Sequence, residues 1–392
     1  MSEEGRRQAR LLAIVAGEAS GDTHGAALMH SLQKADPTIS FIGKGGPKMK
    51  DLAAASGANC FDNWIAEAGV LGLWDVLRHY GYFKKKFDVL LSELAANPPA
   101  ALILVDYPGF NLRLAKAVRK RNIPTRIIYY ISPQVWAWNR RRIPEMAQAL
   151  DLMICIFPFE RDLYETSGLR TIFAGHPMVG ELHAVPTGER DSTLLGLFPG
   201  SRTREVMKIF PSMLGAAELV HRSRPDVRFE AAAATPAHTE ILRTMAEDCG
   251  LEITISTGAS RDLMRRAAAG LVCSGTATLE AACLGLPYAL VYRVAWLTYE
   301  VGIRVIRVPY LGIVNILANR PVIREFIQEN ATPAALADEA LRLLNSEEAR
   351  ERLTHELAGV VSTLGPREGT SASQRAAAAV LECLDKSAQK IH

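Results

Sequence analysis

The sequence predicts an α/β protein with two doubly wound, parallel-sheet domains and a C-terminal helical segment. Uninterrupted apolar segments alternate with amphipathic segments, as expected of a parallel sheet that is covered on both faces. A stretch rich in glycine and proline, residues 174–189, separates two such series. The length of 392 residues is enough for two domains that each bury a core. Both domains are therefore expected to be Rossmann-like.

The first series predicts strands whose following loops carry the polar residues. The expected strands are residues 11–16, 39–43, 101–105, 126–131, 152–157 and 171–174. Ligands of such sheets bind beyond the carboxyl ends of the strands. The loops that follow these strands, residues 17–22, 43–47, 106–111 and 132–138, are therefore expected along one edge of the sheet.

The second series predicts another parallel sheet and then helices alone. Its expected strands are residues 193–198, 227–234, 252–256, 271–273 and 288–292, and its closing helices are residues 333–344, 347–362 and 370–386. The predicted domains are residues 1–182 and 183–365, which face a cleft, and a terminal segment 366–392 that packs back on the N-terminal domain.

The composition excludes several classes of protein. Hydrophobic residues make up 48% and charged residues 22% of the chain, which is ordinary for a globular protein. A net charge of +3 gives no reason to expect a nucleic acid partner. The six cysteines form no C-x-x-C pair and His and Asp show no metal-ligand spacing, so we expect reduced thiols and no metal. Neither a G-x-G-x-x-G after the first strand nor a P-loop is present.

The segment Cys273-Ser-Gly-Thr-Ala-Thr-Leu-Glu280 reads as a strand end, a glycine turn and a helix start. Backbone N–H groups at such a helix start attract an anion, and Ser274 and Thr276 add hydroxyl donors. Glu280 lies one helical turn further on, where a carboxylate could accept from a sugar diol. The alternative is an ordinary capped helix, and the spacing alone does not decide between the two.

Asp106 ends a strand of entirely apolar residues. A carboxylate at that edge could act as a general base, or it could only cap the next helix. Two basic motifs follow strands as well. Pro199-Gly-Ser-Arg202 suits the oxyanions of a phosphate or a helix cap, and Arg140, Arg141 and Arg142 suit a phosphate or a solvated face.

Residues 70–87 place apolar and aromatic side chains at helical spacing before three lysines. The stripe includes Val70, Leu73, Trp74 and Leu77. Tryptophan and lysine beside an apolar stripe suit a membrane interface. A helix that packs on its own sheet explains the same pattern. No segment has the roughly 18 uncharged apolar residues that span a bilayer, so membrane contact is expected to be peripheral.

Together these motifs resemble the lipid-A-disaccharide synthase family. The matching segments run in order along the chain: Val15-Ala-Gly-Glu-Ala-Ser-Gly-Asp22, Gly45-Gly-Pro-Lys-Met49, Val105-Asp106 with Phe110-Asn111, Tyr130-Ile-Ser-Pro-Gln-Val-Trp-Ala-Trp138, Gly175-His-Pro177, Pro199-Gly-Ser-Arg202, Ser274–Glu280 and Asn315. Several are weak when taken singly, but the ordered set covers nearly the whole chain and is specific.

The resemblance implies a metal-independent, inverting glycosyltransferase of GT-B architecture that needs no cofactor. The family transfers 2,3-diacylglucosamine from UDP to the 6-hydroxyl of 2,3-diacylglucosamine 1-phosphate, which gives lipid A disaccharide 1-phosphate and UDP. It acts in lipopolysaccharide synthesis at the cytoplasmic face of the Gram-negative inner membrane. A homodimer is a further expectation.

Family positions map onto residues of this chain. The resemblance implies that Asp106 is the general base, and that UDP is held by Arg202, Ser274, Gly275, Thr276 and Glu280. It places Glu18, Ser20 and Asp22 on the acceptor side and Asn315, Glu325 and Gln328 near the cleft, and it makes residues 70–87 the membrane-facing segment. A second acidic residue common in the aspartate motif is Gly109 here, which leaves Asp106 alone.

Two other functions fit part of the pattern. A UDP-sugar epimerase of the same fold would share the nucleotide loop without needing an interfacial helix. A non-catalytic nucleotide-sugar-binding peripheral membrane protein would keep its function when Asp106 is replaced.

Overall fold

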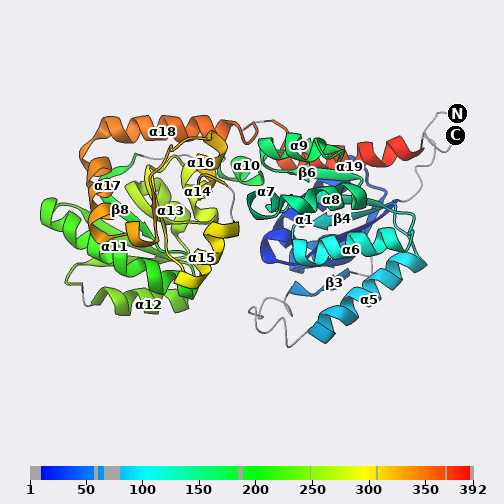
Figure 1. The fold of residues 1–392 in the computed structure, drawn as a ribbon, viewed down its shortest axis with the longest axis horizontal. Coiled ribbons are helices and arrows are strands. Elements are labelled where there is room, and N and C mark those ends of the chain that lie inside the picture. The colour runs from blue at the N-terminus through cyan, green and yellow to red at the C-terminus, as the bar shows by residue number, and fades with distance from the viewer. Residues whose placement is uncertain are drawn as a thin grey trace. The chain divides into compact units, whose positions relative to one another are not determined.

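The computed structural model describes residues 10–56, 61–65, 80–183, 189–247, 249–305, 308–366 and 369–388. They form two compact units, each with its own sheet (Figure 1). The first unit comprises residues 1–177 and 368–392, and the second comprises residues 178–367.

In the described part of the chain, seven parallel strands form the first sheet, in the order β3-β2-β1-β4-β5-β6-β7. They are β1 (Arg10–Ala16), β2 (Ile39–Gly45), β3 (Phe61–Asn63), β4 (Ala101–Val105), β5 (Arg126–Tyr130), β6 (Leu152–Cys155) and β7 (Thr171–Phe173). The helices of the first unit are α1 (Ala19–Ala35), α2 (Pro47–Ala55), α5 (Tyr80–Ala96), α6 (Pro108–Lys120), α7 (Val135–Trp138), η1 (Arg140–Arg142), α8 (Ile143–Ala149), α9 (Pro158–Glu165) and α19 (Ala372–Ala388). The helix α10 (Pro177–His183) begins at the boundary and lies in the second unit from Met178 onward.

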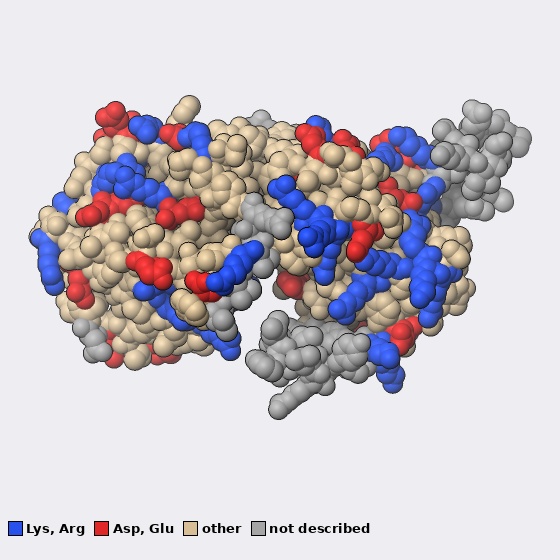
Figure 2. Space-filling view, in the orientation of Figure 1, with Lys and Arg blue, Asp and Glu red and all other residues tan. Residues whose placement is uncertain are grey.

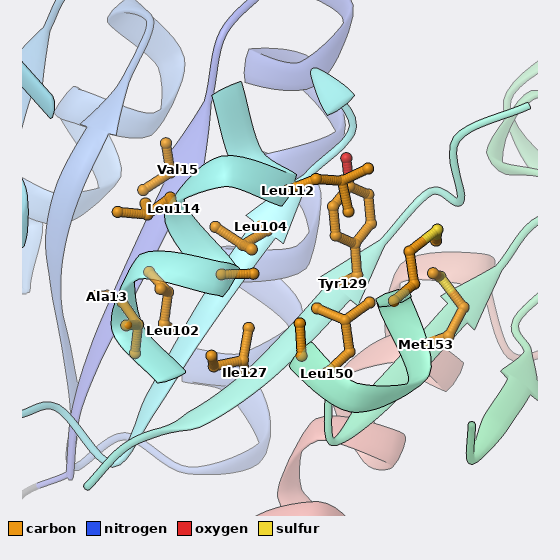
Figure 3. Close-up of a cluster of buried hydrophobic side chains, with 14 of the residues drawn as sticks. Ala13, Val15, Leu102, Leu104, Leu112, Leu114, Ile127, Tyr129, Leu150 and Met153 are labelled. Atoms are coloured by element: carbon orange, nitrogen blue, oxygen red, sulfur yellow. The ribbon is translucent and has the colours of Figure 1, made fainter. Parts of the chain in front are cut away.

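The core of the first unit explains why its strands are continuously apolar. Every residue of β4 is buried, because helices cover both faces of the sheet. On one face, strand side chains such as Leu104 and Tyr129 pack against Leu112 and Leu114 of α6 (Figure 3). This packing therefore holds the carboxyl ends of the central strands β1 and β4 in fixed positions.

The C-terminal helix α19 belongs to the first unit, although it follows the whole of the second in sequence. It packs along α1 and contacts β5 and β6. The hydroxyl of Ser31 donates to Ser373 at 3.0 Å, and the guanidinium of Arg375 donates to the carbonyl of Ala174 at 2.6 Å. Both ends of the described chain thus complete one layered structure.

Six strands, all parallel, make up the sheet of the second unit over its described residues, in the order β10-β9-β8-β11-β12-β13. They are β8 (Asp191–Phe198), β9 (Arg228–Ala233), β10 (Ile253–Thr257), β11 (Ala267–Cys273), β12 (Tyr288–Tyr292) and β13 (Glu325–Ile327). Its helices are α11 (Thr203–Ser223), α12 (Pro236–Glu247), α13 (Ser260–Arg266), α14 (Thr276–Cys283), α15 (Trp296–Val305), α16 (Ile313–Ala318), η2 (Gln328–Asn330), α17 (Pro333–Asn345) and α18 (Glu347–Ser362).

The predicted α/β class, with two parallel sheets and closing helices, is confirmed. The sequence did not predict the short edge strands β3 and β13. Each has three residues, which is too few to give a recognisable apolar period.

The side chain of Arg190 joins three parts of the second unit. One terminal nitrogen donates to the carbonyls of Met264, Arg265 and Ala267, at 2.7, 3.1 and 2.9 Å, and the other donates to Leu284 at 2.6 Å. These carbonyls lie at the ends of α13 and α14, where helices lack internal donors. Burial lowers the pKa of Arg190 to about 10.

Replacing Arg190 with alanine should destabilise the second unit, because several helix-terminal carbonyls lose a charged donor. We expect a loss of about 2–4 kcal/mol. Hydrogen exchange of amides in β8 and β11 measures the loss in this unit directly. The control is Arg228→Ala, which removes an arginine that is 69% exposed and bonded to Asp191, and should cost less than about 1 kcal/mol. Equal losses in the two variants would contradict the assignment.

Candidate active site

The turn after β4 holds Asp106 in an unusual backbone conformation. Asp106 and Tyr107 have φ angles of 46° and 49°, in the left-handed region that residues with a side chain seldom adopt. Such a conformation costs of order 1–3 kcal/mol for each residue and persists only where surrounding contacts impose it. The turn therefore needs a local structural cause.

Two side-chain donors supply that cause by binding the main-chain carbonyl of Asp106. The buried amide of Asn111 donates to it at 2.7 Å and to the carbonyl of Val105 at 3.2 Å. The hydroxyl of Tyr129 donates to the same Asp106 carbonyl at 2.5 Å. The carbonyl is thus fixed from two elements, α6 and β5, and this fixes the position of the Asp106 residue at the end of its strand.

The pKa of the Asp106 carboxyl is raised. Burial is the largest cause and the nearby charge of Glu18 is the second, while the N–H of Tyr107 acts in the opposite direction. A raised pKa makes this carboxylate a stronger base than an exposed aspartate. The position and chemistry of Asp106 suit a general base.

Gly17 brings the first loop against this turn. A Cβ atom at Gly17 would lie 2.2 Å from the ring of Tyr107, so no larger residue fits without moving that ring. Trp64 supports the same place, because its indole donates to the carbonyl of Ala16 at 2.6 Å and its ring meets Tyr107 edge-on. Because the two loops approach each other closely, the charge of Glu18 raises the pKa of the Asp106 carboxyl.

The three residues predicted for the acceptor side differ in their surroundings. Glu18 and Ser20 are exposed at the start of α1. Asp22 is buried, and its carboxylate accepts from the backbone N–H groups of Gly46, Lys48 and Met49 at 3.0 to 3.1 Å. Asp22 therefore caps α2 and joins two strand-end loops. Its direct contact with an acceptor stays a prediction.

A buried carboxylate that sequence reasoning did not single out organises the loop after β5. Glu160 accepts from the hydroxyl of Ser132 at 2.5 Å, the indole of Trp136 at 2.8 Å and the N–H of Phe157 at 3.1 Å. Burial raises the pKa of Glu160 to about 7, although the hydrogen bonds from these donors act to lower it. The only sequence signal was Glu160 in the first turn of a helix, which usually indicates no more than capping.

In the second unit, the turns after β8 and β11 lie side by side. Gly200 and Gly275 have φ angles of 110° and 142°, which only glycine adopts readily. A Cβ at Gly200 would come within 3.2 Å of the sulfur of Cys273, whereas one at Gly275 would meet open space. The predicted anion site, with Ser274, Gly275 and Thr276 at the start of α14, therefore lies beside the Pro199–Arg202 turn.

Glu280 and Arg202 carry the charges near these turns. Glu280 accepts through one oxygen from Arg261 at 2.9 and 2.8 Å, and Arg261 also binds Glu181 at 2.6 Å. Arg202 contacts Glu205 at 2.9 Å and its side chain is 80% exposed. The structure thus brings all five predicted UDP-binding residues to one edge of the second sheet.

The polar residues Asn315, Glu325 and Gln328 support the backbone nearby. Glu325 accepts from the N–H groups of Leu311 and Gly312, both at 2.9 Å, and from the amide of Asn315 at 2.8 Å. Gln328 accepts from the N–H of Val294 at 2.9 Å. These residues order the segments beside β12 and β13, and a substrate contact for them stays a prediction.

Two expectations concern metals and membranes. No group of three or more His, Cys, Asp or Glu side chains that could hold a metal ion occurs among the residues described. Within the same residues, no helix is long and apolar enough to cross a bilayer. The membrane-facing residues predicted from the sequence, Val70, Leu73, Trp74 and Leu77, lie outside the described ranges.

Solved structures with this arrangement identify the class of fold. The UDP-GlcNAc 2-epimerase from Neisseria meningitidis bound to UDP-GlcNAc matches with a TM-score of 0.60 at 12% identity, over 96% of this chain and 100% of that one. The MurG of Acinetobacter baumannii matches with a TM-score of 0.54 at 13% identity, over 95% and 99% of the chains. These likenesses concern the fold, and the protein has the GT-B-type fold of two Rossmann-like units.

Sequence comparison identifies the family within that class. The profile described as lipid-A-disaccharide synthetase matches residues 12–380. The lipid-A-disaccharide synthase of Trichlorobacter lovleyi is 39% identical over 387 residues, which cover 95% of this chain and 97% of that protein. That of Burkholderia thailandensis is 38% identical over 387 residues, with 95% and 96% covered. The chain belongs to the lipid-A-disaccharide synthase family, a family of glycosyltransferases, as its motifs predicted.

The raised pKa of Glu160 predicts a pH dependence of stability. The pKa of Glu160 rises from an ordinary 4.5 to about 7 on folding, so the folded state binds the proton more tightly than the unfolded state. The free energy of unfolding therefore decreases as pH increases from 4.5 to 7. The loss is at most about 1.4 kcal/mol per pH unit. Relative to Glu160→Gln, the wild type should lose about 2 kcal/mol between pH 5 and pH 8.

Hydrogen exchange in β5 and β6 at the two pH values provides the measurement. Glu165→Gln, an exposed change on the same helix, should keep the wild-type pH dependence. A parallel pH dependence in wild type and Glu160→Gln would show that Glu160 stays ionised throughout.

Proposed function

We propose that this protein transfers 2,3-diacylglucosamine from UDP to the 6-hydroxyl of 2,3-diacylglucosamine 1-phosphate. The products are lipid A disaccharide 1-phosphate and UDP. The observation that carries the proposal is the half-buried Asp106 at a strand end, whose main-chain carbonyl accepts from two side chains, in a chain of this family. The relatives at 39% and 38% identity bear the name lipid-A-disaccharide synthase.

The second unit supplies the chemistry for holding the donor. Backbone N–H groups at the start of α14 and the guanidinium of Arg202 would bind the diphosphate. Glu280 would accept from the ribose hydroxyls through the oxygen that does not bind Arg261. Gly275 admits the close backbone approach, because a side chain there would project into open space where the phosphate must lie.

The first unit supplies the base. As the acceptor 6-hydroxyl attacks C1 of the donor sugar, its proton passes to the Asp106 carboxylate. The bond from C1 to the diphosphate oxygen breaks, UDP leaves with that electron pair, and C1 inverts. The helix dipole of α14 and Arg202 stabilise the leaving charge, so the reaction as proposed needs neither metal nor cofactor.

The remaining assignments follow from the substrates. Glu18, whose charge acts on Asp106, and the exposed Ser20 would contact the acceptor sugar, and Asp22 would fix their loop. Asn315, Glu325 and Gln328 would shape the donor side. Because both proposed substrates are acylated, the protein would act as a peripheral protein at a membrane, and we propose the cytoplasmic face of the inner membrane. A homodimer remains a proposal.

A two-substrate assay tests the proposed function. Purified protein given the UDP-linked diacyl sugar and the acyl sugar phosphate should release UDP and form one heavier glycolipid. Asp106→Ala should lower turnover by roughly 10²–10⁴-fold, because the general base is lost, while its affinity for UDP changes less than two-fold. Asp51→Asn, an exposed change on α2, is the control and should keep full turnover.

Other outcomes separate the alternatives. Consumption of the UDP sugar without the second lipid would favour an epimerase or a hydrolase. Binding of UDP without any turnover would favour a non-catalytic nucleotide-sugar-binding protein. Full turnover in Asp106→Ala would exclude this residue as the base.

Glu18→Gln should change the pH profile. The charge of Glu18 raises the pKa of Asp106, so its removal should lower that pKa. A base works when deprotonated, so the acidic limb of kcat/KM should move to lower pH. Glu165→Gln should leave the profile unchanged. An acidic limb in the Glu18 variant that stays in place would mean that another group sets it.

A further inference from the structure

A basic groove begins beside the Asp106 turn and lies between α6 and α8. Its volume is about 410 Å³, and its walls include Pro108, Gly109 and Arg113 of α6 and Arg141 and Arg142 of η1. Gly109 is three residues from Asp106, which limits their separation to about 11 Å even for an extended chain. The groove therefore begins within about 11 Å of the proposed base.

The charge of the groove is not balanced by the protein. Four cationic side chains line it, Arg113, Lys116, Arg141 and Arg142, against one carboxylate, Glu145. Glu145 binds Lys116 at 2.5 Å, so this carboxylate is already engaged. Figure 2 shows lysine and arginine side chains gathered on the face of the first unit where α6 and α8 lie.

Two arginines close to the groove have an acidic partner. Arg119, also on α6, and Arg126 both bind Asp151. Within the described ranges, by contrast, Arg113 and Arg141 are exposed and have no ion pair. Arg113 and Arg141 therefore leave two guanidinium groups in the groove that no carboxylate of the described chain neutralises.

The shape of the groove favours a small anion over a flat surface. Arg142 is held against the ring of Trp138, with its guanidinium carbon 5.4 Å from the ring centre. Gly109 leaves the way from Asp106 open, because a Cβ there would meet no atom within 4 Å. Guanidinium groups bind phosphate oxygens in pairs, and the start of α6 adds a favourable dipole.

We propose that this groove binds the 1-phosphate of the acceptor, and so selects a phosphorylated acceptor. The inference rests on the proposed function. The hexosamine carries its reacting 6-hydroxyl on one side of the ring oxygen and its phosphate on the other. Asp106 accepts the proton of the 6-hydroxyl, and Arg113 and Arg141 bind the phosphate. The groove thereby orients the sugar so that the 6-hydroxyl faces the base.

The double variant Arg113→Ala/Arg141→Ala tests this assignment in the full-length protein. In detergent micelles without anionic lipid, its KM for the acceptor should rise at least ten-fold, whereas the KM for the UDP sugar and kcat should change less than two-fold. The control is Lys120→Ala/Arg121→Ala, which removes the same charge from the exposed end of α6 outside the groove, and should change each constant less than two-fold.

An acceptor without its phosphate gives the sharper comparison. The wild type should use it with a KM at least ten-fold higher, and the groove variant should no longer distinguish the two acceptors. Retention of the full ten-fold preference by the variant would overturn the proposal.

Direct binding separates this inference from the proposed transfer reaction. Calorimetry with glucosamine 1-phosphate should show an affinity at least ten-fold weaker in the groove variant than in the wild type and the control. This result would stand even if no disaccharide formed, in which case only the proposed reaction would fail. Equal binding by all three proteins would reject the phosphate site.

Vesicles test the competing source of phosphate. If the groove variant loses binding to phosphatidylglycerol vesicles but keeps the wild-type KM for the acceptor in micelles, the groove contacts the membrane and the proposal is wrong. If phosphatidylglycerol binding is unchanged while the acceptor KM rises, the acceptor phosphate is the occupant.

Discussion

The carbonyl oxygen of Asp106 is the acceptor on which the arrangement of the first unit's site depends. Asn111 and Tyr129 both donate to it, and so keep two adjacent residues with side chains in the left-handed region. From that turn follow the place of the carboxylate, the position of the Tyr107 ring over Gly17 and the start of the groove at Pro108. The functional groups of this edge are thus positioned by main-chain geometry.

The second unit reaches a comparable result by different means. Its turns at Gly200 and Gly275 adopt positive φ angles because glycine has no Cβ, and no side-chain donors are needed to impose them. A glycine turn keeps the backbone accessible, which suits an anion bound through N–H groups. A turn imposed on an aspartate keeps a side chain in place, which suits proton transfer. The two turns therefore match the two kinds of chemistry proposed for them.

Sequence reasoning located the fold and the site edges because both follow from local patterns. Continuous apolar strands predict parallel sheets, and the loops at Glu18, Asp106 and Ser274 follow such strands directly. Contacts between distant segments were not predictable in this way. The link from Glu160 to Ser132 and Trp136, and the capping of α2 by Asp22, depend on packing that no spacing reveals. The groove beside α6 was visible only as an arginine run with two interpretations.

The place of α19 has a consequence for how the protein forms during translation. Its contacts with α1 and with Ala174 complete the first unit, yet the ribosome makes this helix after the entire second unit. Part of α1 and the β5–β6 surface of the first unit therefore stay uncovered until α19 has been synthesised. The second unit has all of its residues before that point and can complete its folding earlier. During that interval the uncovered surface is open to a chaperone or to the α19 of another nascent chain.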